Sequence, residues 1–426
     1  MRKYYFVLFI AVSAIIISGC CSTRTEQTKG QVWVPVYKTY SDIRAGIKNE
    51  GAKDLKDPGK IYVYGNYLFI NERSQGIHII NNQDPSNPKN IAFINIPGNG
   101  DIAVIGNILY ADSYTDLVAF DITDPTNSKV VKRINDIFPN MLDPNGQYTD
   151  QKQGIIVKWD VKDTVYTYTY STCDQYSVSP VDRGGLYDKR FLGADGSGSG
   201  SGTNSSGPSG VGGSMARFTI YKKYMYSVDQ ANLQVFDISK PDNPLPWARV
   251  NLGWNIETIF PYKDKLFIGS QTGMFIYDNT IPWNPTYLCE FRHSRGCDPV
   301  VANDKYAYVT LRSGTRCNNN RNELLIVDIS TITNPKLIKE YPMQEPAGLG
   351  IDGTTLFICD GKSGLKVFDV TTPTGIDLLS WKSDFQTYDI IPLGDYAIII
   401  GSDGLYQYDY KDPKNMVFLS KIPVTK

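Results

Sequence analysis

The sequence predicts an all-β protein, a seven-bladed β-propeller built from four-stranded blades. An apolar strand that ends at an aspartate and leads into a proline turn recurs along the chain, as in Leu324–Asp328 followed by Pro335. The corresponding positions are Asn81, Asp121, Asp237, Asp278, Asp328, Asp369 and Asp409. Their spacing is near 40 residues, and each unit contains four short strand-like segments, which is the pattern of a propeller blade. No copy has a helical period, so a TIM barrel or a helical solenoid is disfavoured.

The chain begins with a targeting signal. Met1-Arg2-Lys3 is basic, Phe6–Ile17 is apolar, and the run ends in Ile17-Ser18-Gly19-Cys20. Small residues before a cysteine resemble the lipobox of bacterial lipoproteins, whose cysteine thiol takes the lipid. The apolar run is short for a membrane-spanning helix. We therefore expect residues 1–19 to be a lipoprotein signal peptide and Cys20 to be the lipidated first residue.

Residues 20–59 are expected to form a tether and an N-terminal arm. Within the arm, Val32–Tyr37 is a candidate strand, and Ser41 is the expected N-cap of a short helix. The repeats occupy 60–426, in copies at 60–97, 98–138, 215–252, 253–292, 293–342, 343–382 and 383–426. Two ways to close the ring remain open: packing of the last blade on the first, or addition of the Val32–Tyr37 strand to a neighbouring blade.

Each copy has the same internal order. Tight hairpin turns such as Gly65-Asn66 and Asp264-Lys265 join the first and second strands. The aspartate that ends the third strand is expected to accept backbone amides of the following turn. The proline of that turn fits where the sheet needs no backbone donor. This recurrence indicates a structural role for Asp328 and its equivalents.

Leu324–Asp328, together with Leu117–Asp121, Leu233–Asp237 and Leu365–Asp369, resembles the LVIVD repeat. That family consists of predicted β-propeller proteins of bacteria and archaea, many of them surface or envelope proteins. The whole chain also resembles uncharacterised lipoproteins of the Bacteroidota type. The resemblance implies a fold and an envelope location, and it supplies no catalytic motif. Copies one, four and seven depart from the repeat, at Asn81, Phe275–Tyr277 and Tyr406–Tyr408.

An insertion at 139–214 separates the second and third copies. Its first part contains Gly154–Trp159 and Thr164–Tyr170, which we expect to form an extra hairpin. Its second part, 193–214, is almost entirely Gly, Ser, Asn and Thr, and is expected to be a flexible linker. A phosphate-binding loop would need a following helix, and the sequence predicts none here.

The fifth copy is about ten residues longer than the others. Cys297 precedes its first strand and Cys317 follows its second, so a hairpin places both cysteines at one end. In an exported protein we expect a disulfide between them, which would contribute about 3 kcal/mol through loop closure. Two free thiols are the alternative. Cys289 and Cys359 are expected to be buried small hydrophobic residues.

The insertion and the long loop of the fifth copy fall on one face of a propeller, because both follow even-numbered strands of their blades. That face is the expected binding surface. The candidate ligand- or partner-binding residues are Arg295, Asp298, Arg312, Arg316, Arg321, Trp254 and Glu257. The alternative is that these are ordinary solvated charges and loop-packing residues.

Composition excludes several function classes. Lys and Arg number 43 against 44 Asp and Glu, which argues against a nucleic-acid binder. The two histidines, His78 and His293, lie in distant copies, so we expect no metal, no cofactor and no enzyme. The prediction is a protein-binding or assembly scaffold, lipid-anchored at the bacterial outer membrane with an envelope protein partner. The alternatives are a carbohydrate-binding surface lipoprotein, or a propeller hydrolase or lyase that uses Glu257 and Asp298 on glycans.

Overall fold

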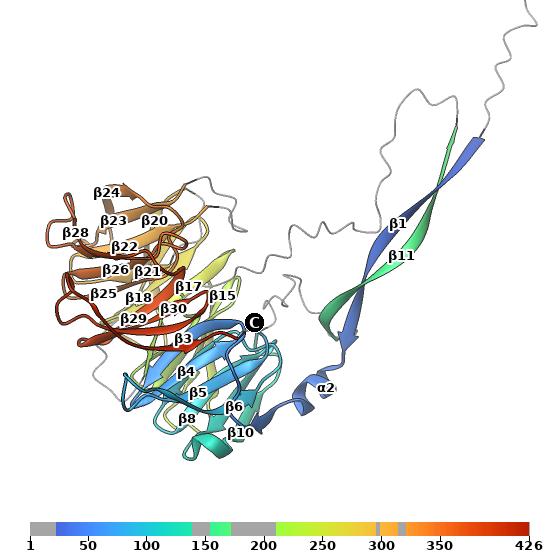
Figure 1. Cartoon of the computed structure of the whole chain (residues 1–426), viewed down its shortest axis with the longest axis horizontal. Coiled ribbons are helices and arrows are strands. Elements are labelled where there is room, and N and C mark those ends of the chain that lie inside the picture. The colour runs from blue at the N-terminus through green and yellow to red at the C-terminus, as the bar shows by residue number, and fades with distance from the viewer. Residues whose placement is uncertain (1–22, 139–153, 172–209, 295–298, 314–320, 426) are drawn as a thin grey trace, which may run out of the picture. The chain divides into compact units, whose positions relative to one another are not determined.

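The computed structural model describes residues 23–138, 154–171, 210–294, 299–313 and 321–425. The chain divides into two compact units. The propeller unit comprises 38–155 with 194–426, and the ribbon unit comprises 1–37 with 156–193. Figure 1 shows the elements of both units.

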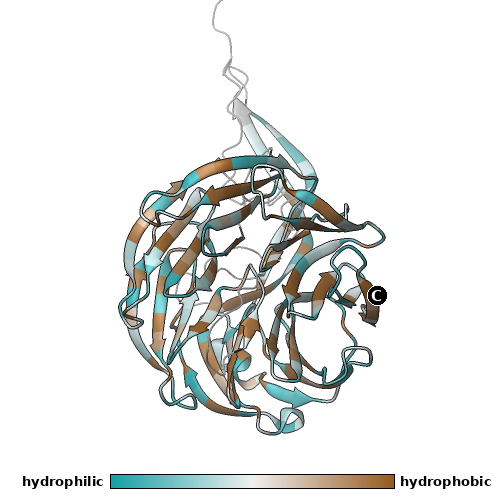
Figure 2. Ribbon diagram, turned by 90° about the vertical axis from the view of Figure 1, so that its left-hand side faces the viewer, coloured by the Kyte–Doolittle hydropathy of each residue, from teal (hydrophilic) through white to brown (hydrophobic). Residues whose placement is uncertain are grey.

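The propeller unit contains seven antiparallel sheets, and Figure 2 shows them around a ring. Blades 1 to 3 contain β3 (Pro58–Tyr64), β4 (Tyr67–Glu72), β5 (Gly76–Asn81), β6 (Lys89–Asn95); β7 (Ile102–Ile105), β8 (Ile108–Ser113), β9 (Asp116–Asp121), β10 (Lys129–Ile134); and β13 (Phe218–Tyr221), β14 (Tyr224–Val228), β15 (Asn232–Asp237), β16 (Leu245–Asn251). A 3-10 turn, η1 (Pro125–Asn127), precedes β10.

Blades 4 and 5 contain β17 (Ile256–Tyr262), β18 (Lys265–Ser270), β19 (Gly273–Asp278), β20 (Thr286–Arg292); and β21 (Val300–Ala302), β22 (Tyr306–Leu311), β23 (Glu323–Asp328), β24 (Lys336–Pro342). Blades 6 and 7 contain β25 (Leu349–Asp352), β26 (Thr355–Cys359), β27 (Leu365–Asp369), β28 (Asp377–Lys382); and β29 (Thr387–Pro392), β30 (Tyr396–Gly401), β31 (Gly404–Asp409), β32 (Val417–Pro423). The predicted all-β fold with seven four-stranded blades is confirmed.

The apolar segment that defines the repeat forms the third strand of each blade and lies in the core. In β23, the side chains of Leu324, Ile326 and Val327 are completely buried. The hydrophobic core around them combines residues from blades 4, 5 and 6, so each blade packs on its neighbours. Burial of these aliphatic side chains holds the ring together.

The acceptor at the end of the third strand behaves as predicted in all seven blades. Its Oδ1 atom accepts the backbone amide two residues further on, at distances between 2.8 and 3.2 Å. In blade 5 the bond runs from the amide of Ser330 to Asp328, at 2.8 Å. In blade 1, Asn81 makes the same bond at 3.0 Å, so the amide side chain replaces the carboxylate there.

The turn prolines also connect neighbouring blades. The Tyr110 hydroxyl in β8 donates to the carbonyl of Pro241 in the next blade, at 2.7 Å. The Tyr226 hydroxyl in β14 donates to the carbonyl of Pro282, also at 2.7 Å. The aromatic residue of the second strand therefore binds the turn of the following blade.

The ring closes by packing of blade 7 on blade 1. A hydrophobic cluster joins Leu55 and the first strands of blade 1 to β29, β30 and β31. Leu55 pairs with Val424 in a parallel bridge, and its carbonyl accepts the Thr425 amide at 2.8 Å. The side chains of Asn82 and Gln407 bind each other across the junction, at 2.7 and 2.9 Å. The alternative closure, by a Val32–Tyr37 strand, is wrong because that segment pairs in the ribbon unit.

Blade 1 has an additional strand on each side. The outer one is β2 (Lys48–Glu50), beside β6, and the inner one is β12 (Val211–Gly212), beside β3. A short helix, α2 (Tyr40–Ala45), precedes β2. Its N-cap is Thr39 and not Ser41 as predicted, because the Thr39 hydroxyl accepts the Asp42 amide.

The ribbon unit contains one two-stranded sheet, formed by β1 (Thr23–Lys38) and β11 (Ile155–Ser171). Figure 1 shows the two strands side by side along their length, which is roughly 50 Å for 16 extended residues. The predicted hairpin within the insertion is therefore wrong. The residues between its two expected strands include no glycine or proline, and the chain continues as one strand that pairs with β1. Within the described residues, no helix is long and apolar enough to cross a membrane.

Candidate functional site

All candidate site residues that the structure describes lie on one face of the propeller unit. In each blade the first and third strands run together, opposite to the second and fourth. The loops after the second strands and after the fourth strands therefore share one face. We call it the insertion face, because the insertion leaves β10 and enters β13 there. Its described loop residues include Gly98–Asp101, Leu252–Asn255, Arg312–Ser313 and Arg321–Asn322.

Trp254 is the most exposed large hydrophobic side chain of the described residues, at 73%. It lies between Gly253 and Asn255, which both have positive φ, at 113° and 60°. Asn255 is uncommon in this conformation, so the turn is held by its surroundings. The Ile256 amide donates to the Gln230 carbonyl at 3.2 Å, and the Gln271 amide donates to the Asn255 carbonyl at 3.1 Å. A fixed backbone thus presents an indole ring to solvent.

The other candidates are placed as follows. Glu257 begins blade 4 and accepts from the Gln271 side chain at 3.1 Å. Arg312 is partly buried just after β22, and Arg321 forms an ion pair with Glu323 at 3.5 Å. The other candidate residues lie outside the described residues: Arg295, Asp298, Arg316 and both cysteines of the expected disulfide, Cys297 and Cys317.

The end of the insertion crosses the central channel, where a flexible linker was expected up to Ser214. Its contacts reach the channel-lining first strands of four blades. Val211 and Gly212 pair with β3 of blade 1, and the Gly210 amide donates to the Val104 carbonyl of blade 2 at 3.1 Å. The Ser214 hydroxyl accepts the Leu349 amide of blade 6 at 3.0 Å.

The last of these contacts is in blade 4, where the Ala216 carbonyl accepts the Ile259 amide at 2.9 Å. The segment needs small residues, since a Cβ atom on Gly210 would lie 2.3 Å from the Tyr62 ring. Residues 210–216 therefore cross the channel between the first strands of these four blades. The linker prediction was wrong for this part because composition alone does not reveal the partners that a glycine-rich segment meets.

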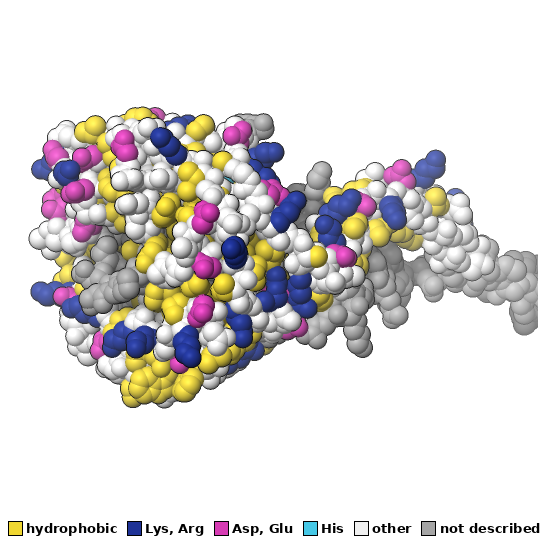
Figure 3. All heavy atoms as spheres, turned by 90° about the horizontal axis from the view of Figure 1, so that it is seen from below, with side chains coloured by type: hydrophobic (Ala, Val, Ile, Leu, Met, Phe, Trp, Pro, Cys, Tyr) yellow, Lys and Arg dark blue, Asp and Glu magenta, His cyan; other side chains and the backbone are white. Residues whose placement is uncertain are grey.

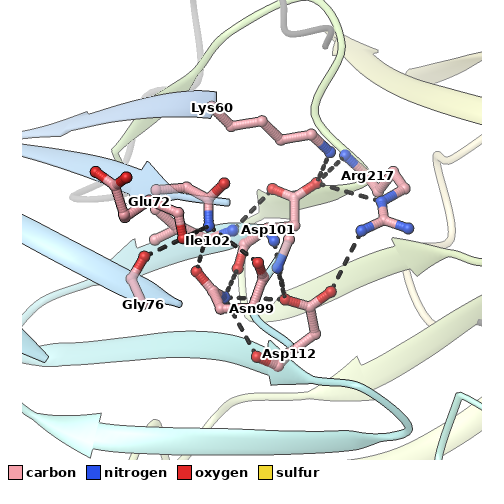
Figure 4. Close-up of polar contacts among 10 residues, drawn as sticks. Lys60, Glu72, Gly76, Asn99, Asp101, Ile102, Asp112 and Arg217 are labelled. Atoms are coloured by element: carbon pink, nitrogen blue, oxygen red, sulfur yellow. Dashed lines mark hydrogen bonds and ion pairs between the residues drawn. The ribbon is translucent and has the colours of Figure 1, made fainter. Parts of the chain in front are cut away.

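A charged cluster, shown in Figure 4, includes Arg217, which directly follows this segment. Asp101 Oδ2 binds the ammonium group of Lys60 and the backbone amide of Arg217. Asp112 Oδ1 accepts the Gly100 amide at 2.7 Å, the Asp101 amide at 2.9 Å and the Asn99 side-chain amide at 2.9 Å. Asp112 Oδ2 faces the Arg217 guanidinium at 3.3 Å. The cluster joins blades 1, 2 and 3.

Burial dominates the electrostatics of this cluster. It lowers the pKa of Lys60, although the Asp101 carboxylate opposes the shift. It raises the pKa of Asp112, although Arg217 and two backbone amides oppose that shift. Two acids and two bases leave the cluster without net charge, and the described side chains bind one another. The arrangement can lock three blades together and fix the end of the insertion.

Sequence reasoning missed this cluster, although a signal was present. Acidic residues recur at or just after the end of the second strand, at Glu72, Asp112, Asp229 and Asp360, and all four are buried. Apolar strands that repeatedly end in a buried acid indicate a structural requirement for backbone acceptors. Asp360 accepts the amides of Gln344 and Glu345 at 2.9 and 2.8 Å.

A second ionic group holds the arm to blade 2. The Arg44 guanidinium binds both carboxylate oxygens of Asp116, at 2.8 and 3.0 Å, and Arg133 binds the same carboxylate at 2.9 Å. Burial by itself would raise the pKa of Asp116, but these arginines and the Asp136 amide lower it below its usual value.

The cysteines and metal donors add no reactive centre among the described residues. Cys359 is completely buried, and burial raises its pKa well above the usual value. Cys289 is partly buried, and its thiol donates to the Ile332 carbonyl at 3.0 Å. No group of three or more His, Cys, Asp or Glu side chains in the described part of the chain is arranged to hold a metal ion.

Comparison with known families identifies the repeats. A family model described as the LVIVD repeat matches residues 57–94, 99–136, 212–251 and 296–342, which correspond to blades 1, 2, 3 and 5. The chain carries LVIVD repeats. The departure at Asn81 does not prevent a match to blade 1, whereas blades 4, 6 and 7 lie outside the matched segments.

Solved structures support the propeller fold. A protein from Lactobacillus plantarum is 14% identical, with 86% of this chain and 96% of that chain covered and a TM-score of 0.53. The periplasmic gluconolactonase of Pseudomonas aeruginosa is 9% identical, with coverage of 86% and 97% and a TM-score of 0.51. A functionally unknown protein from Desulfotomaculum acetoxidans is 11% identical, with coverage of 84% and 95% and a TM-score of 0.51. Comparison with curated proteins finds no match.

Proposed function

We propose that this protein is a lipid-anchored scaffold of the bacterial envelope that binds a protein partner through its insertion face. Cys20 would carry the lipid and hold the chain at the outer membrane. The proposal assigns no catalytic role, since the charged side chains described at the channel are engaged with one another and residues 210–216 occupy the channel itself.

The observation that carries the proposal is Trp254. An exposed indole on a hydrogen-bonded turn loses little conformational entropy on binding, and tryptophan is enriched among residues that dominate binding energy. Arg312 and Arg321 lie in a loop of the neighbouring blade on the same face. Tryptophan and arginine are both enriched in protein interfaces, so these side chains suit a binding surface.

A pull-down from solubilised envelopes tests this assignment. The full-length protein should retain an envelope protein that Trp254→Ala loses, with at least about a tenfold drop in recovery for a central anchor. Trp283→Ala is the matched control, because Trp283 is 46% exposed in the turn between β19 and β20, on the opposite face. Equal recovery with both variants would contradict the assignment.

Lipid attachment has its own test. Labelled palmitate should enter the full-length protein and should not enter Cys20→Ala, which should leave the membrane fraction. Protease treatment of whole cells would show which side of the outer membrane the propeller faces. Carbohydrate binding is the alternative function, and binding of the purified protein to a glycan array that Trp254→Ala abolishes would favour it.

A further inference from the structure

The ribbon unit has an unpaired edge that the proposed function does not use. Among the described strands, β1 and β11 pair only with each other. The Gln31 side chain contacts Asp163 at 3.2 Å, and Thr25 contacts Thr169 at 3.3 Å, so the strands are antiparallel. A two-stranded ribbon is marginally stable by itself in water, and an exposed edge is a template for another strand.

The edge of β11 is better suited to pairing than that of β1. Pro35 removes one backbone donor from β1, and prolines of this kind blunt a sheet edge. In β11, all residues retain their amides. Val161 and Val165 are 44% and 52% exposed on one face of the strand. Lys158, Asp160 and Lys162 alternate on the other face, where Lys158 and Asp160 form an exposed ion pair at 2.9 Å.

We propose that two copies of this chain associate through antiparallel pairing of their β11 edges, centred on Val161. Val161 of one copy then lies opposite Val161 of the other, and each Asp160 lies opposite a Lys162. Val157 lies opposite Val165, and Trp159 lies opposite Asp163, so the valines of the two copies meet on one face of the joined sheet. The two ribbons become a single four-stranded sheet.

Charge complementarity and the length of the paired segment together select this register. A slide by four residues, centred on Trp159, also places Asp160 opposite Lys158, but it pairs a shorter part of β11. Sliding one strand by two residues in one direction places Asp160 opposite Asp160 and Lys162 opposite Lys158. Sliding it by two residues in the other direction places Lys162 opposite Lys162. A shift of one residue puts the valine face of one copy beside the charged face of the other. Like charges directly opposite each other destabilise a strand pair, and opposite charges stabilise it.

Charge reversal tests the pairing, with sedimentation velocity of the full-length protein in detergent over a range of concentrations. Asp160→Lys and Lys162→Asp should each weaken the dimer about tenfold, because each creates two like-charged pairs. The double variant Asp160→Lys/Lys162→Asp should return to within about threefold of the unsubstituted protein. A monomer at every concentration, or a double variant as weak as the single variants, would overturn the proposal.

Cysteine cross-linking tests the register. Directly opposed residues of antiparallel strands have Cα atoms about 4.5 to 5.5 Å apart, within the range for a disulfide. Val161→Cys should therefore form a covalent dimer under mild oxidation, beyond any formed by the unsubstituted protein. Val165→Cys is the control, since its opposite residue is Val157. Equal cross-linking of the two variants would refute this register, and binding of the ribbon to lipid vesicles without dimers would refute the association.

Discussion

Substitution of Asp112 distinguishes the role of its hydrogen bonds from the role of its charge. The carboxylate accepts three bonds on Oδ1, from Asn99, Gly100 and Asp101, and faces Arg217 with Oδ2. In Asp112→Ala, the buried Asp101 amide loses its acceptor, whereas the Asn99 side-chain amide keeps the carbonyls of Asp101 and Asp112, and Arg217 is exposed enough to reach water. A stranded buried donor costs about 1 to 3 kcal/mol, so the free energy of unfolding should fall by about 2 to 3 kcal/mol.

Asp112→Asn is the matched variant, since its amide oxygen can accept the same three bonds. It loses the ion pair with Arg217, but it also removes a charge whose burial raises the pKa of Asp112. We therefore expect a loss of about 1 kcal/mol. Urea unfolding followed by tryptophan fluorescence measures both changes, provided the m-value stays constant. Equal losses of stability for the alanine and asparagine variants would show that Asp112 stabilises the fold through its charge and not through its hydrogen bonds.

Two further predictions concern the blade turns and the arm. Asp328→Ala should lower the free energy of unfolding by about 1 kcal/mol, while Asp328→Asn should change it little, because Asn81 makes the same turn bond in blade 1. Urea unfolding of both variants measures the two changes, and equal losses of stability would contradict the role of the turn bond. Hydrogen bonds from two arginines lower the folded-state pKa of Asp116 below 3.8. The contribution of Asp116 to the free energy of unfolding should therefore be present above about pH 4 and should be lost as the pH falls through the lowered pKa. Thermal melts across pH 2 to 6 should show a smaller loss on acidification for Asp116→Asn than for the unsubstituted protein, and identical profiles would refute the assignment.

The sequence predicted the blades because the repeated segment serves the same physical purpose each time. The third strand is buried on both faces, and its terminal acceptor satisfies a turn amide in every blade, so the pattern is local and recurs. The aromatic residue of the second strand, such as Tyr226, also recurs, but its partner Pro282 lies in the next blade. The contact between them could be seen only once the ring was known.

The parts that sequence reasoning missed depend on partners distant in the chain. Ile155–Ser171 forms one strand because it pairs with β1, which lies more than a hundred residues earlier in the chain. Residues 210–216 have the composition of a linker, and only the surrounding first strands of four blades give them a fixed path. The Lys60 and Arg217 contacts with Asp101 likewise connect three blades. Trp254, in contrast, could be assigned to the insertion face from the order of the strands, although its exposure required the structure.

The junction of blade 7 with blade 1 has a consequence for the chain order of the ring. No strand is exchanged there, and Leu55 and Thr425 are hydrogen-bonded neighbours although 370 positions separate them. A short peptide joining Leu55 to Thr425, with new termini opened in the turn between two other blades, would keep the four main strands of every blade as a continuous segment, although it would remove β2 from the edge of blade 1. Circular permutants of the propeller unit should therefore fold, since the order in which the blades are connected is separable from the contacts that hold them together.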